Sequence, residues 1–256
     1  MAGRLDGRVV IVTGGGHGIG KAYCRGLAAE GARVVVAEID GEAGGQTAEA
    51  LERELGAEAL AVRTDVADAA NAAEMAARTL ERFGRIDVLV NNAAVFATIP
   101  ISRVGIEDIP VEEWDLVMAV NLRGIFLACR AVLPAMKHQG KGKIINIASG
   151  TALSGSPTRI HYVTSKAGVL GFTRTLAREV GPSGITVNAI APGSTLSEEN
   201  PTDEILRMRQ APLESRALRR VQVPADLVGT VIFFASDDSD FITGQTLVVD
   251  GGATMH

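Results

Sequence analysis

The stretch TGGGHGIG, residues 13–20, lies between an apolar run that ends at Val12 and a segment with helical spacing. Glycines at a strand-to-helix junction let backbone N–H groups approach a diphosphate, and the amino terminus of the helix adds partial positive charge. Gly14, Gly18 and Gly20 are placed for this contact, although their spacing differs from the G-x-G-x-x-G dinucleotide fingerprint. By itself the stretch fits an ordinary turn equally well, so its interpretation depends on the rest of the chain.

Short β-branched runs alternate with longer amphipathic segments along the chain, which predicts βαβ units and a parallel sheet. We expect strands at residues 9–13, 33–38, 59–63, 88–91, 143–148, 186–191 and 246–249. We expect helices at 18–30, 42–55, 69–83, 111–138, 160–180 and 225–235. No linker, repeat or low-complexity tract interrupts this series. Residues 1–256 are therefore expected to form one α/β, doubly wound Rossmann domain, with a seven-stranded parallel sheet and helices on both faces.

Successive expected strands end in residues that suit a dinucleotide. Glu38 ends the second strand, where an acidic residue can accept hydrogen bonds from the adenosine ribose. Asp65 follows the third strand, where it could accept from the adenine amino group, and NNAA at 91–94 ends the fourth. Because the carboxyl ends of parallel strands meet at one edge of a sheet, the sequence predicts a ligand site at this edge.

A long connection, residues 194–223, joins the expected strand at 186–191 to the expected helix at 225–235. Connections well beyond ~15 residues are commonly functional lids or disordered segments. Its place after the carboxyl end of a strand indicates a lid that covers the bound substrate. A surface insertion that packs on itself is the alternative.

Composition excludes several kinds of partner. The formal net charge of −5 and the pI near 5.5 argue against a nucleic-acid or anionic-membrane surface. The amino terminus resembles neither a signal peptide nor a membrane span, so a cytoplasmic location is expected. Cys24 and Cys129 lie in helical apolar patterns without metal-ligand spacing, so we expect buried, reduced thiols and no metal site.

Seven motifs together resemble the short-chain dehydrogenase/reductase family over nearly the whole chain. They are TGxxxGxG at 13–20, NNAA at 91–94, Asn121 in VNLRG, Ser149 in NIASG, YVTSK at 162–166, PG at 192–193 and FITGQTLVVDGG at 241–252. Two positions depart from the family pattern, because NNAA replaces the usual NNAG and Ser197 replaces a Thr that usually meets the nicotinamide carboxamide. The resemblance implies a homotetramer that binds NAD and a small alcohol or ketone.

The resemblance and the strand ends together predict two sets of site residues. The catalytic set is Asn121, Ser149, Tyr162 and Lys166. The cofactor-binding set is Gly14, Gly16, His17, Gly18, Ile19, Gly20, Glu38, Ile39, Asp65, Val66, Asn91, Ala93, Tyr162, Lys166, Pro192, Gly193, Thr195 and Ser197. Glu38 favours NAD over NADP, since a 2′-phosphate would place like charge against its carboxylate. Protonated His17 is the one nearby group that could partly neutralise that phosphate.

The expected chemistry of Tyr162 and Lys166 follows from their spacing of four residues on one helix, which makes them neighbours on one face. A phenol with a pKa near 10 is a poor base, so Lys166 and an oxidised nicotinamide are expected to lower the pKa of Tyr162 by ~3 units. Ser149, just past a strand end, can bind the same substrate oxygen. The role of Asn121, positioning a water that links Lys166 to solvent, is implied by the resemblance alone. An ordinary amphipathic helix face is the alternative for Tyr162 and Lys166.

The substrate is expected to be an apolar secondary alcohol or ketone, aryl or alicyclic. Apolar residues on loops near the expected pocket suggest this: Phe96, Ile99, Leu153, Leu196, Leu206 and Met208. TRIHYVTSK and the carboxyl-terminal stretch also resemble aryl and alicyclic alcohol dehydrogenases, 1-phenylethanol dehydrogenases among them. His161 is expected to be a packing or rim residue, because it points away from the Tyr162 face.

Two alternative functions stay open. One is a 3-oxoacyl-carrier-protein reductase, although Ser183 stands where such enzymes often have Arg, and Glu198 and Glu199 would repel an acidic carrier. The other is a non-enzymatic dinucleotide-sensing protein on the same fold. The intact set of Ser149, Tyr162 and Lys166 argues against the second alternative.

Overall fold

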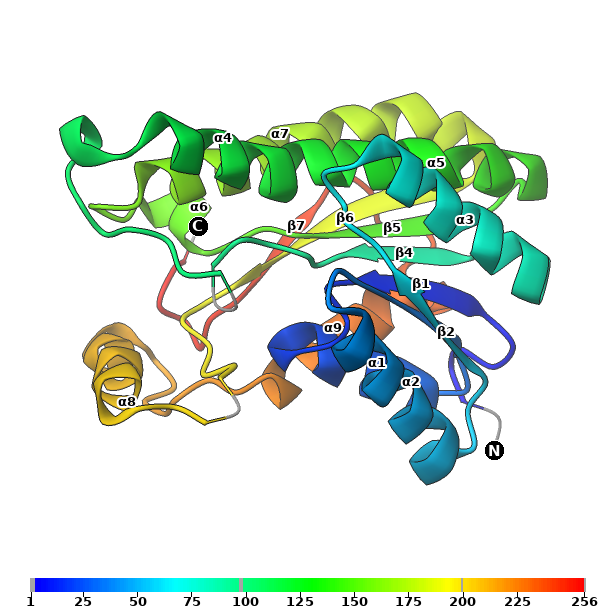
Figure 1. Ribbon diagram of the computed structural model, residues 1–256, viewed down its shortest axis with the longest axis horizontal. Helices are drawn as coiled ribbons and strands as arrows, with labels where there is room; N and C mark the ends of the chain where they lie inside the picture. Colours follow the sequence, from blue (N-terminus) through cyan, green and yellow to red (C-terminus); the bar gives the residue numbers. More distant parts are fainter. Residues whose placement is uncertain (1–2, 97–98, 199, 256) are drawn as a thin grey trace.

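A seven-stranded parallel sheet forms the centre of the structure (Figure 1), a computed structural model that describes residues 3–96, 99–198 and 200–255. The strands are β1 Val9–Thr13, β2 Arg33–Glu38, β3 Ala59–Arg63, β4 Val88–Asn91, β5 Gly142–Ile147, β6 Ile185–Pro192 and β7 Thr246–Val249. Their order is β3-β2-β1-β4-β5-β6-β7, and every neighbouring pair is parallel. The chain therefore reverses its direction of winding between β1 and β4, which is where such sheets bind ligands.

Helices cover both faces of this sheet (Figure 1). One layer holds α1 Gly18–Ala29, α2 Gly41–Leu55 and α9 Ala225–Ala235, and the other holds α3 Ala69–Phe83, α4 Val111–Met118, α5 Gly124–Gln139 and α7 Ile160–Val180. β1 is buried along its whole length: Val9 and Ile11 enter one core, and Val10 and Val12 enter the other. The unbroken apolar run of β1 thus follows from burial on both sides.

Polar residues and glycines fix the ends of several helices. Asp40 caps α2, since its Oδ1 accepts hydrogen bonds from the N–H groups of Glu42 and Ala43 at 3.1 Å each. Gly56 ends that helix in the left-handed conformation, with φ of 63°. These caps satisfy helix-terminal groups that would otherwise lack partners, and the Asp40 cap lets α2 begin at Gly41, close to Glu38.

The predicted fold class is confirmed, and most expected elements agree with the structure to within one residue. The expected helix at 111–138 is different: a π-helical turn, Ala119–Arg123, separates α4 from α5. The continuous helical segment Val111–Gln139 is long and apolar enough to cross a membrane by those criteria alone. It packs on β4, β5, α3 and α7 instead, as a core helix of this α/β domain.

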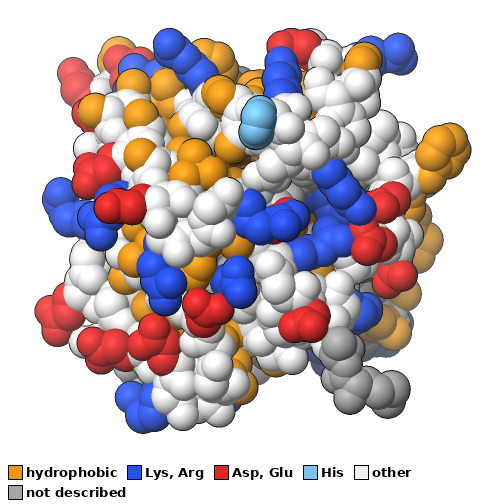
Figure 2. Space-filling view, turned by 90° about the vertical axis from the view of Figure 1, so that its right-hand side faces the viewer, with side chains coloured by type: hydrophobic (Ala, Val, Ile, Leu, Met, Phe, Trp, Pro, Cys, Tyr) orange, Lys and Arg blue, Asp and Glu red, His pale blue; other side chains and the backbone are white. Residues whose placement is uncertain are grey.

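The long connection at 194–223 contains a helix, α8 Asp203–Gln210, and a 3-10 segment, Ala211–Ser215. It lies at the carboxyl edge of the sheet (Figure 1). The opposite edge, seen in Figure 2, carries basic and acidic side chains close together. Ion pairs next to the amino ends of β1 and β5 include Arg8 with Asp237 at 2.5 Å and Lys141 with Asp240 at 3.2 Å. These pairs neutralise part of the charge at that end of the sheet.

Candidate active site

A cavity of about 640 Å³ lies at the carboxyl edge of the sheet. Tyr162, Lys166 and Ser149 line it, together with most of the residues expected to hold the cofactor: Gly14, His17, Gly18, Ile19, Gly20, Glu38, Ile39, Asp65, Val66, Ala93, Pro192, Gly193, Thr195 and Ser197. The two predicted sets therefore share one space, although they come from distant parts of the sequence. Its volume suits a small-molecule site.

The glycine loop adopts a conformation that only glycine tolerates well. Gly14 and Gly18 have φ of 64° and 47°, in the left-handed region. A Cβ on Gly20 would lie 1.9 Å from the Gly14 carbonyl oxygen, so α1 begins in direct contact with the loop. Gly16 does not line the cavity; its N–H donates to Glu38 Oε2 at 3.0 Å. The loop thus brings the amino terminus of α1 to the cavity and also holds Glu38.

Glu38 has the environment expected of a residue that accepts hydrogen bonds from ribose hydroxyls. Its side chain is buried, and its carboxylate accepts from three backbone N–H groups: Gly16 at 3.0 Å, Ile39 at 2.8 Å and Asp40 at 3.3 Å. A carboxylate has about four acceptor positions, so it can accept a further hydrogen bond on the cavity side. The residues present therefore fit a dinucleotide whose ribose reaches Glu38.

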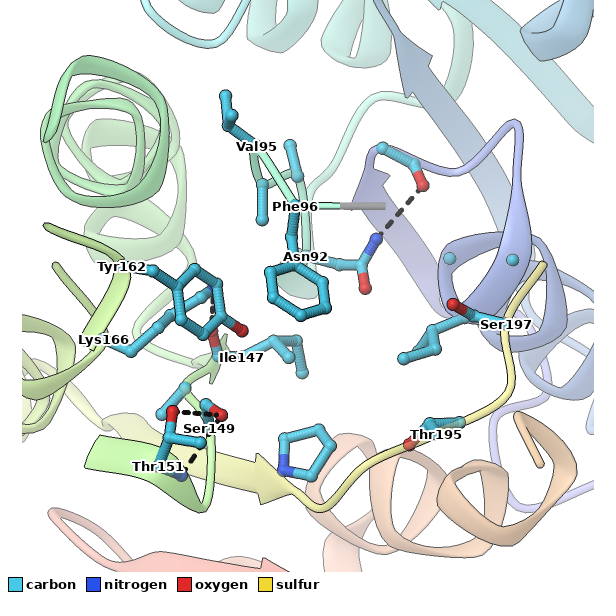
Figure 3. Close-up of a pocket in the computed structure, with 18 of the residues that line it drawn as sticks. Asn92, Val95, Phe96, Ile147, Ser149, Thr151, Tyr162, Lys166, Thr195 and Ser197 are labelled. Atoms are coloured by element: carbon cyan, nitrogen blue, oxygen red, sulfur yellow. Dashed lines mark hydrogen bonds between the residues drawn. The ribbon is translucent and has the colours of Figure 1, made fainter. Parts of the chain in front are cut away.

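The proposed reacting groups face the opposite part of the cavity (Figure 3). The Tyr162 hydroxyl points toward the open centre, near Ser149 and the Phe96 ring. Lys166 Nζ donates to the Ile147 carbonyl at 2.8 Å and lies 5.9 Å from the centroid of the Tyr162 ring. The Ser149 hydroxyl lies 3.0 Å from that of Thr151. One turn of α7 thus presents a phenol and an ammonium group to the same space.

Burial dominates the acid–base properties of this pair. It lowers the pKa of Lys166 to about 8. It also raises the pKa of Tyr162, while a hydrogen-bonding interaction with Ser149 and the positive charges of Arg159 and Arg209 oppose that rise. Loss of solvation thus outweighs the opposing contributions of the chain's own groups. The expected lowering of the Tyr162 pKa by Lys166 and a nicotinamide stays a prediction.

Two predicted asparagines lie outside the cavity lining. Asn121, in the π-helical turn, is fully buried, and its side chain accepts from the Val95 N–H at 2.8 Å and donates to Ser165 Oγ at 3.2 Å. It connects the segment after β4 to α7. The Asn91 side chain donates to Asn146 Oδ1 at 2.9 Å within the sheet. Successive side chains of a strand point to opposite faces, so Asn92, and not Asn91, lines the cavity.

His161 is buried, as expected of a packing residue. Its Nε2 lies 2.8 Å from Glu113 Oε1, which also accepts from the Ser102 N–H at 2.7 Å. Glu113 therefore joins α7 to the segment before α4. The two cysteines are buried free thiols, and burial raises the pKa of each. Among residues in the described ranges, no group of three or more His, Cys, Asp or Glu side chains could hold a metal ion.

The lining of the substrate end is more basic than the sequence suggested. Phe96 and Ile99 line the cavity, but Leu153, Leu196 and Leu206 do not, and Glu199 and the Met208 side chain lie outside what the structure describes. Four arginines line it as well: Arg103, Arg159, Arg209 and Arg216. Sequence reasoning missed them because three lie on loops or on the long connection. The position of Arg159, three residues before Tyr162, was the one available signal.

The chain is similar to known proteins over almost its whole length. A family model described as Enoyl-(Acyl carrier protein) reductase matches residues 14–254. A 3-oxoacyl-[acyl-carrier-protein] reductase from Synechocystis sp. is 41% identical, over 98% of each chain.

Two solved structures superpose closely. A short-chain type dehydrogenase/reductase from Mycobacterium marinum is 31% identical with a TM-score of 0.90, over 98% of this chain and 97% of that one. An NAD+-bound xylitol dehydrogenase is 30% identical with a TM-score of 0.89, over 97% and 99%.

Proposed function

The chain belongs to the short-chain dehydrogenase/reductase family, and we propose that it transfers a hydride between NAD(H) and a secondary alcohol or the corresponding ketone. The observation that carries this proposal is the shared cavity, in which Ser149, Tyr162 and Lys166 face the same space as Glu38 and the glycine loop. A protein that only sensed a dinucleotide would not need the phenol and the ammonium group at one end of it.

Each reacting residue has a distinct task. A bound nicotinamide supplies the hydride acceptor or donor. Tyr162 takes the proton from the substrate hydroxyl during oxidation and returns it to the carbonyl oxygen during reduction. Ser149 donates a hydrogen bond to that oxygen. Lys166, held by the Ile147 carbonyl, stabilises the phenolate form of Tyr162 when it is charged.

Glu38 supports NAD as the cofactor. At an effective dielectric constant near 20, two unit charges about 4 Å apart repel by roughly 4 kcal/mol, so a ribose 2′-phosphate would be rejected. His17 also lines the cavity, and its Nε2 lies 3.8 Å from Asp40 Oδ2. The Asp40 carboxylate would therefore offset a positive charge on the imidazole. Gly15, Gly16 and Ile39 provide no compensating cation.

The part of the substrate next to the carbinol carbon is apolar in this proposal. Phe96 lies 4.6 Å from the Tyr162 ring, centroid to centroid, and Val95 and Ile147 also line the space. Aryl and alicyclic groups would suit such walls. We further propose that the enzyme works in the cytoplasm as a homotetramer.

A 3-oxoacyl-carrier-protein reductase is the second candidate, favoured by the relative from Synechocystis sp. that has this name. Glu198 is paired with Arg209, so it does not present a free negative charge to an acidic carrier. The repulsion expected from the sequence is therefore weaker at this residue. We expect a higher kcat/KM for apolar secondary alcohols and ketones than for 3-oxoacyl thioesters. The reverse order would make the second candidate the better description.

Steady-state assays that follow nicotinamide absorbance test the proposal. A panel of secondary alcohols is given to the wild type and to Glu38→Ala with NAD+ and with NADP+. We expect the wild type to prefer NAD+ by at least ~100-fold in kcat/KM, within the ~4 kcal/mol available, and Glu38→Ala to lose most of that preference. Glu49→Ala, on the exposed side of α2, is the matched control and should retain it. A wild-type preference for NADP+, or an NAD+ preference unchanged in Glu38→Ala, would contradict the role of Glu38.

A further inference from the structure

Two of the four cavity arginines are held by residues of the long connection at 194–223. Arg209 Nη2 lies 2.5 Å from Glu198 Oε1, and Arg216 donates to the Ser194 carbonyl oxygen at 2.7 Å. The other two, Arg103 and Arg159, have no carboxylate within ion-pair distance in the part of the chain that the structure describes. The substrate end of the cavity thus contains two cations, Arg103 and Arg159, whose guanidinium groups contact neither a carboxylate nor a backbone carbonyl in the described residues.

Arg159 is held close to the reacting residues. It directly precedes α7 and lies three residues before Tyr162. Its Cζ lies 5.9 Å from the centroid of the Phe96 ring, which in turn lies 4.6 Å from the Tyr162 ring. Its Nη2 donates to Ser156 Oγ, which fixes one side of the guanidinium. The remaining donors are available to a molecule that extends from Tyr162 past Phe96.

The backbone before Arg159 is strained. Thr158 has φ of 63°, and among the described residues it is the only one other than glycine in the left-handed region. A β-branched residue adopts this conformation only when its surroundings impose it, and such strain is concentrated at functional sites. The strained turn sets the direction in which Arg159 leaves the start of α7.

The electrostatic surroundings of Arg159 favour a negatively charged ligand. Burial lowers the pKa of Arg159, and the positive charges of Arg103 and Arg209 lower it further, while Tyr162 opposes this shift. A partly buried cation that lies near other cations loses solvation without gaining a partner. A bound anion compensates for the lost solvation through charge-assisted hydrogen bonds, which are strongest to a guanidinium.

We propose that Arg159, assisted by Arg103, binds an anionic oxygen-bearing group, a carboxylate or a sulfonate, on the substrate. This inference rests on the proposed function, because the other end of the same molecule presents its carbinol carbon to Tyr162. The apolar part between the two ends contacts Phe96. The cofactor diphosphate is a less suitable partner, since the glycine loop expected to hold it follows β1, whereas Arg159 begins α7 beside Tyr162.

The test compares acids with uncharged analogues of the same shape. Hydroxy acids of the form CH3–CH(OH)–(CH2)n–COO−, lengthened one methylene at a time, are assayed with NAD+ beside their primary amides. At the best chain length we expect kcat/KM for the acid to exceed that for the amide by at least ~10-fold, as a charge-assisted hydrogen bond predicts. Arg159→Gln should abolish most of this ratio, Arg159→Lys should retain part of it, and Arg78→Gln, exposed on α3, should leave it unchanged.

A binding experiment keeps this inference separate from the proposed function. Alkanoates and alkanesulfonates are titrated into the NADH-loaded wild type and Arg159→Gln by calorimetry. Binding of either anion that weakens at least ~10-fold in the variant supports the inference even if no alcohol in the panel is oxidised, and the two titrations distinguish carboxylate from sulfonate. Equal kcat/KM for acid and amide, or no anion binding by the wild type, would overturn it. An unchanged acid-to-amide ratio with a raised KM for NAD+ in Arg159→Gln would assign this arginine to the cofactor instead.

Discussion

Tyr162 differs from Tyr23, the only other tyrosine of the chain, in what its hydroxyl faces. The Tyr162 hydroxyl points into the cavity, whereas that of Tyr23 is buried in the core with no hydrogen-bond partner in the described structure. Both phenols have pKa values raised by burial. A raised pKa alone therefore does not identify the reacting residue, and the position of the hydroxyl in the shared cavity does.

We predict that Tyr162→Phe lowers kcat by about 10²- to 10⁴-fold, because it removes the proton-transfer group. The Phe96 contact and the cofactor end of the cavity are retained, so the dissociation constant for NADH should change little. Stopped-flow turnover and fluorescence titration measure the two quantities. Tyr23→Phe is the matched control and should keep full activity, with unchanged or higher stability, since it removes an unpaired buried hydroxyl. A loss of less than about tenfold in Tyr162→Phe would assign the proton transfer elsewhere.

Lys166 predicts a pH dependence of stability. Burial lowers its pKa from 10.5 to about 8, so the folded state binds this proton less tightly than the unfolded state. Below pH 8 both states are protonated, and the folded state bears the full cost of the buried charge, at most about 3 kcal/mol. Between pH 8 and 10.5 the folded state releases the proton first, so stability rises with pH through this window.

Urea unfolding of the wild type and Lys166→Met at pH 7 and pH 9.5 measures this effect. From pH 7 to pH 9.5, we expect the free energy of unfolding to rise by about 2 kcal/mol more in the wild type than in the variant. The difference at a single pH is less informative, because the variant also leaves the Ile147 carbonyl without its donor. A difference between the two proteins that is the same at both pH values would show that Lys166 keeps an ordinary pKa.

Single residues differ in how far the sequence predicts their place. Glu38, Tyr162 and Lys166 were predictable because each has a fixed position relative to a strand end or along one helix turn. Asn91 and Asn92 are adjacent, and only the direction of the strand pleat decides which one faces the cavity. Arg103 and Arg159 are far apart in the sequence but line one cavity, so their shared surroundings depend on tertiary structure that no local pattern contains.

At the scale of elements, the strand and helix ranges followed from apolar periodicity and end signals. The π-helical turn at Ala119–Arg123 did not, since a local change in helical hydrogen bonding leaves the apolar pattern of the long segment almost unchanged. The connection at 194–223 was expected as a lid, but its helix α8 is strongly charged and gave no clear apolar pattern. The sequence indicated the position of this connection along the chain. Its conformation depends on contacts within it, such as the ion pair of Arg209 with Glu198.

The close contact between α1 and the glycine loop predicts that Gly20 tolerates no side chain, whereas Gly45 on α2 does. Gly20→Ala would place a methyl group 1.9 Å from the Gly14 carbonyl oxygen, so the loop must move. We expect a lower melting temperature and at least ~10-fold weaker NADH binding, since the start of α1 can no longer approach the diphosphate as closely. Gly45→Ala, on α2, meets nothing within 4 Å and should instead stabilise the protein by up to ~1 kcal/mol through helix propensity. Thermal unfolding and fluorescence titration of both variants make the comparison. Equal behaviour of the two would mean that the loop is more adaptable than this packing implies.

At the scale of the whole molecule, two separate apolar surfaces are exposed. The first lies on α4, α5 and α7, where Leu116 is 43% and Phe126 is 47% exposed beside a hollow lined by Met118, Leu122 and Phe172. The second lies at the β7 edge of the sheet, where Leu247 is 43% exposed, and Phe241, in the loop that leads into β7, is fully exposed. Large exposed apolar residues grouped in this way usually mark contacts with other proteins.

Two different surfaces on one chain predict a tetramer with three perpendicular two-fold axes. Each surface can pair with its own copy in a closed, isologous contact, and two such contacts together assemble four chains. We expect light scattering coupled to size-exclusion chromatography to give a tetramer for the wild type. Phe126→Asp places a charge in the helical contact and should yield dimers held by the β7 edge, whereas Leu247→Asp should yield dimers held by the helices. Arg78→Asp, on exposed α3, is the control and should remain tetrameric. A wild type that is monomeric at micromolar concentration would contradict the prediction, and monomers from either single variant would show that the two contacts depend on each other.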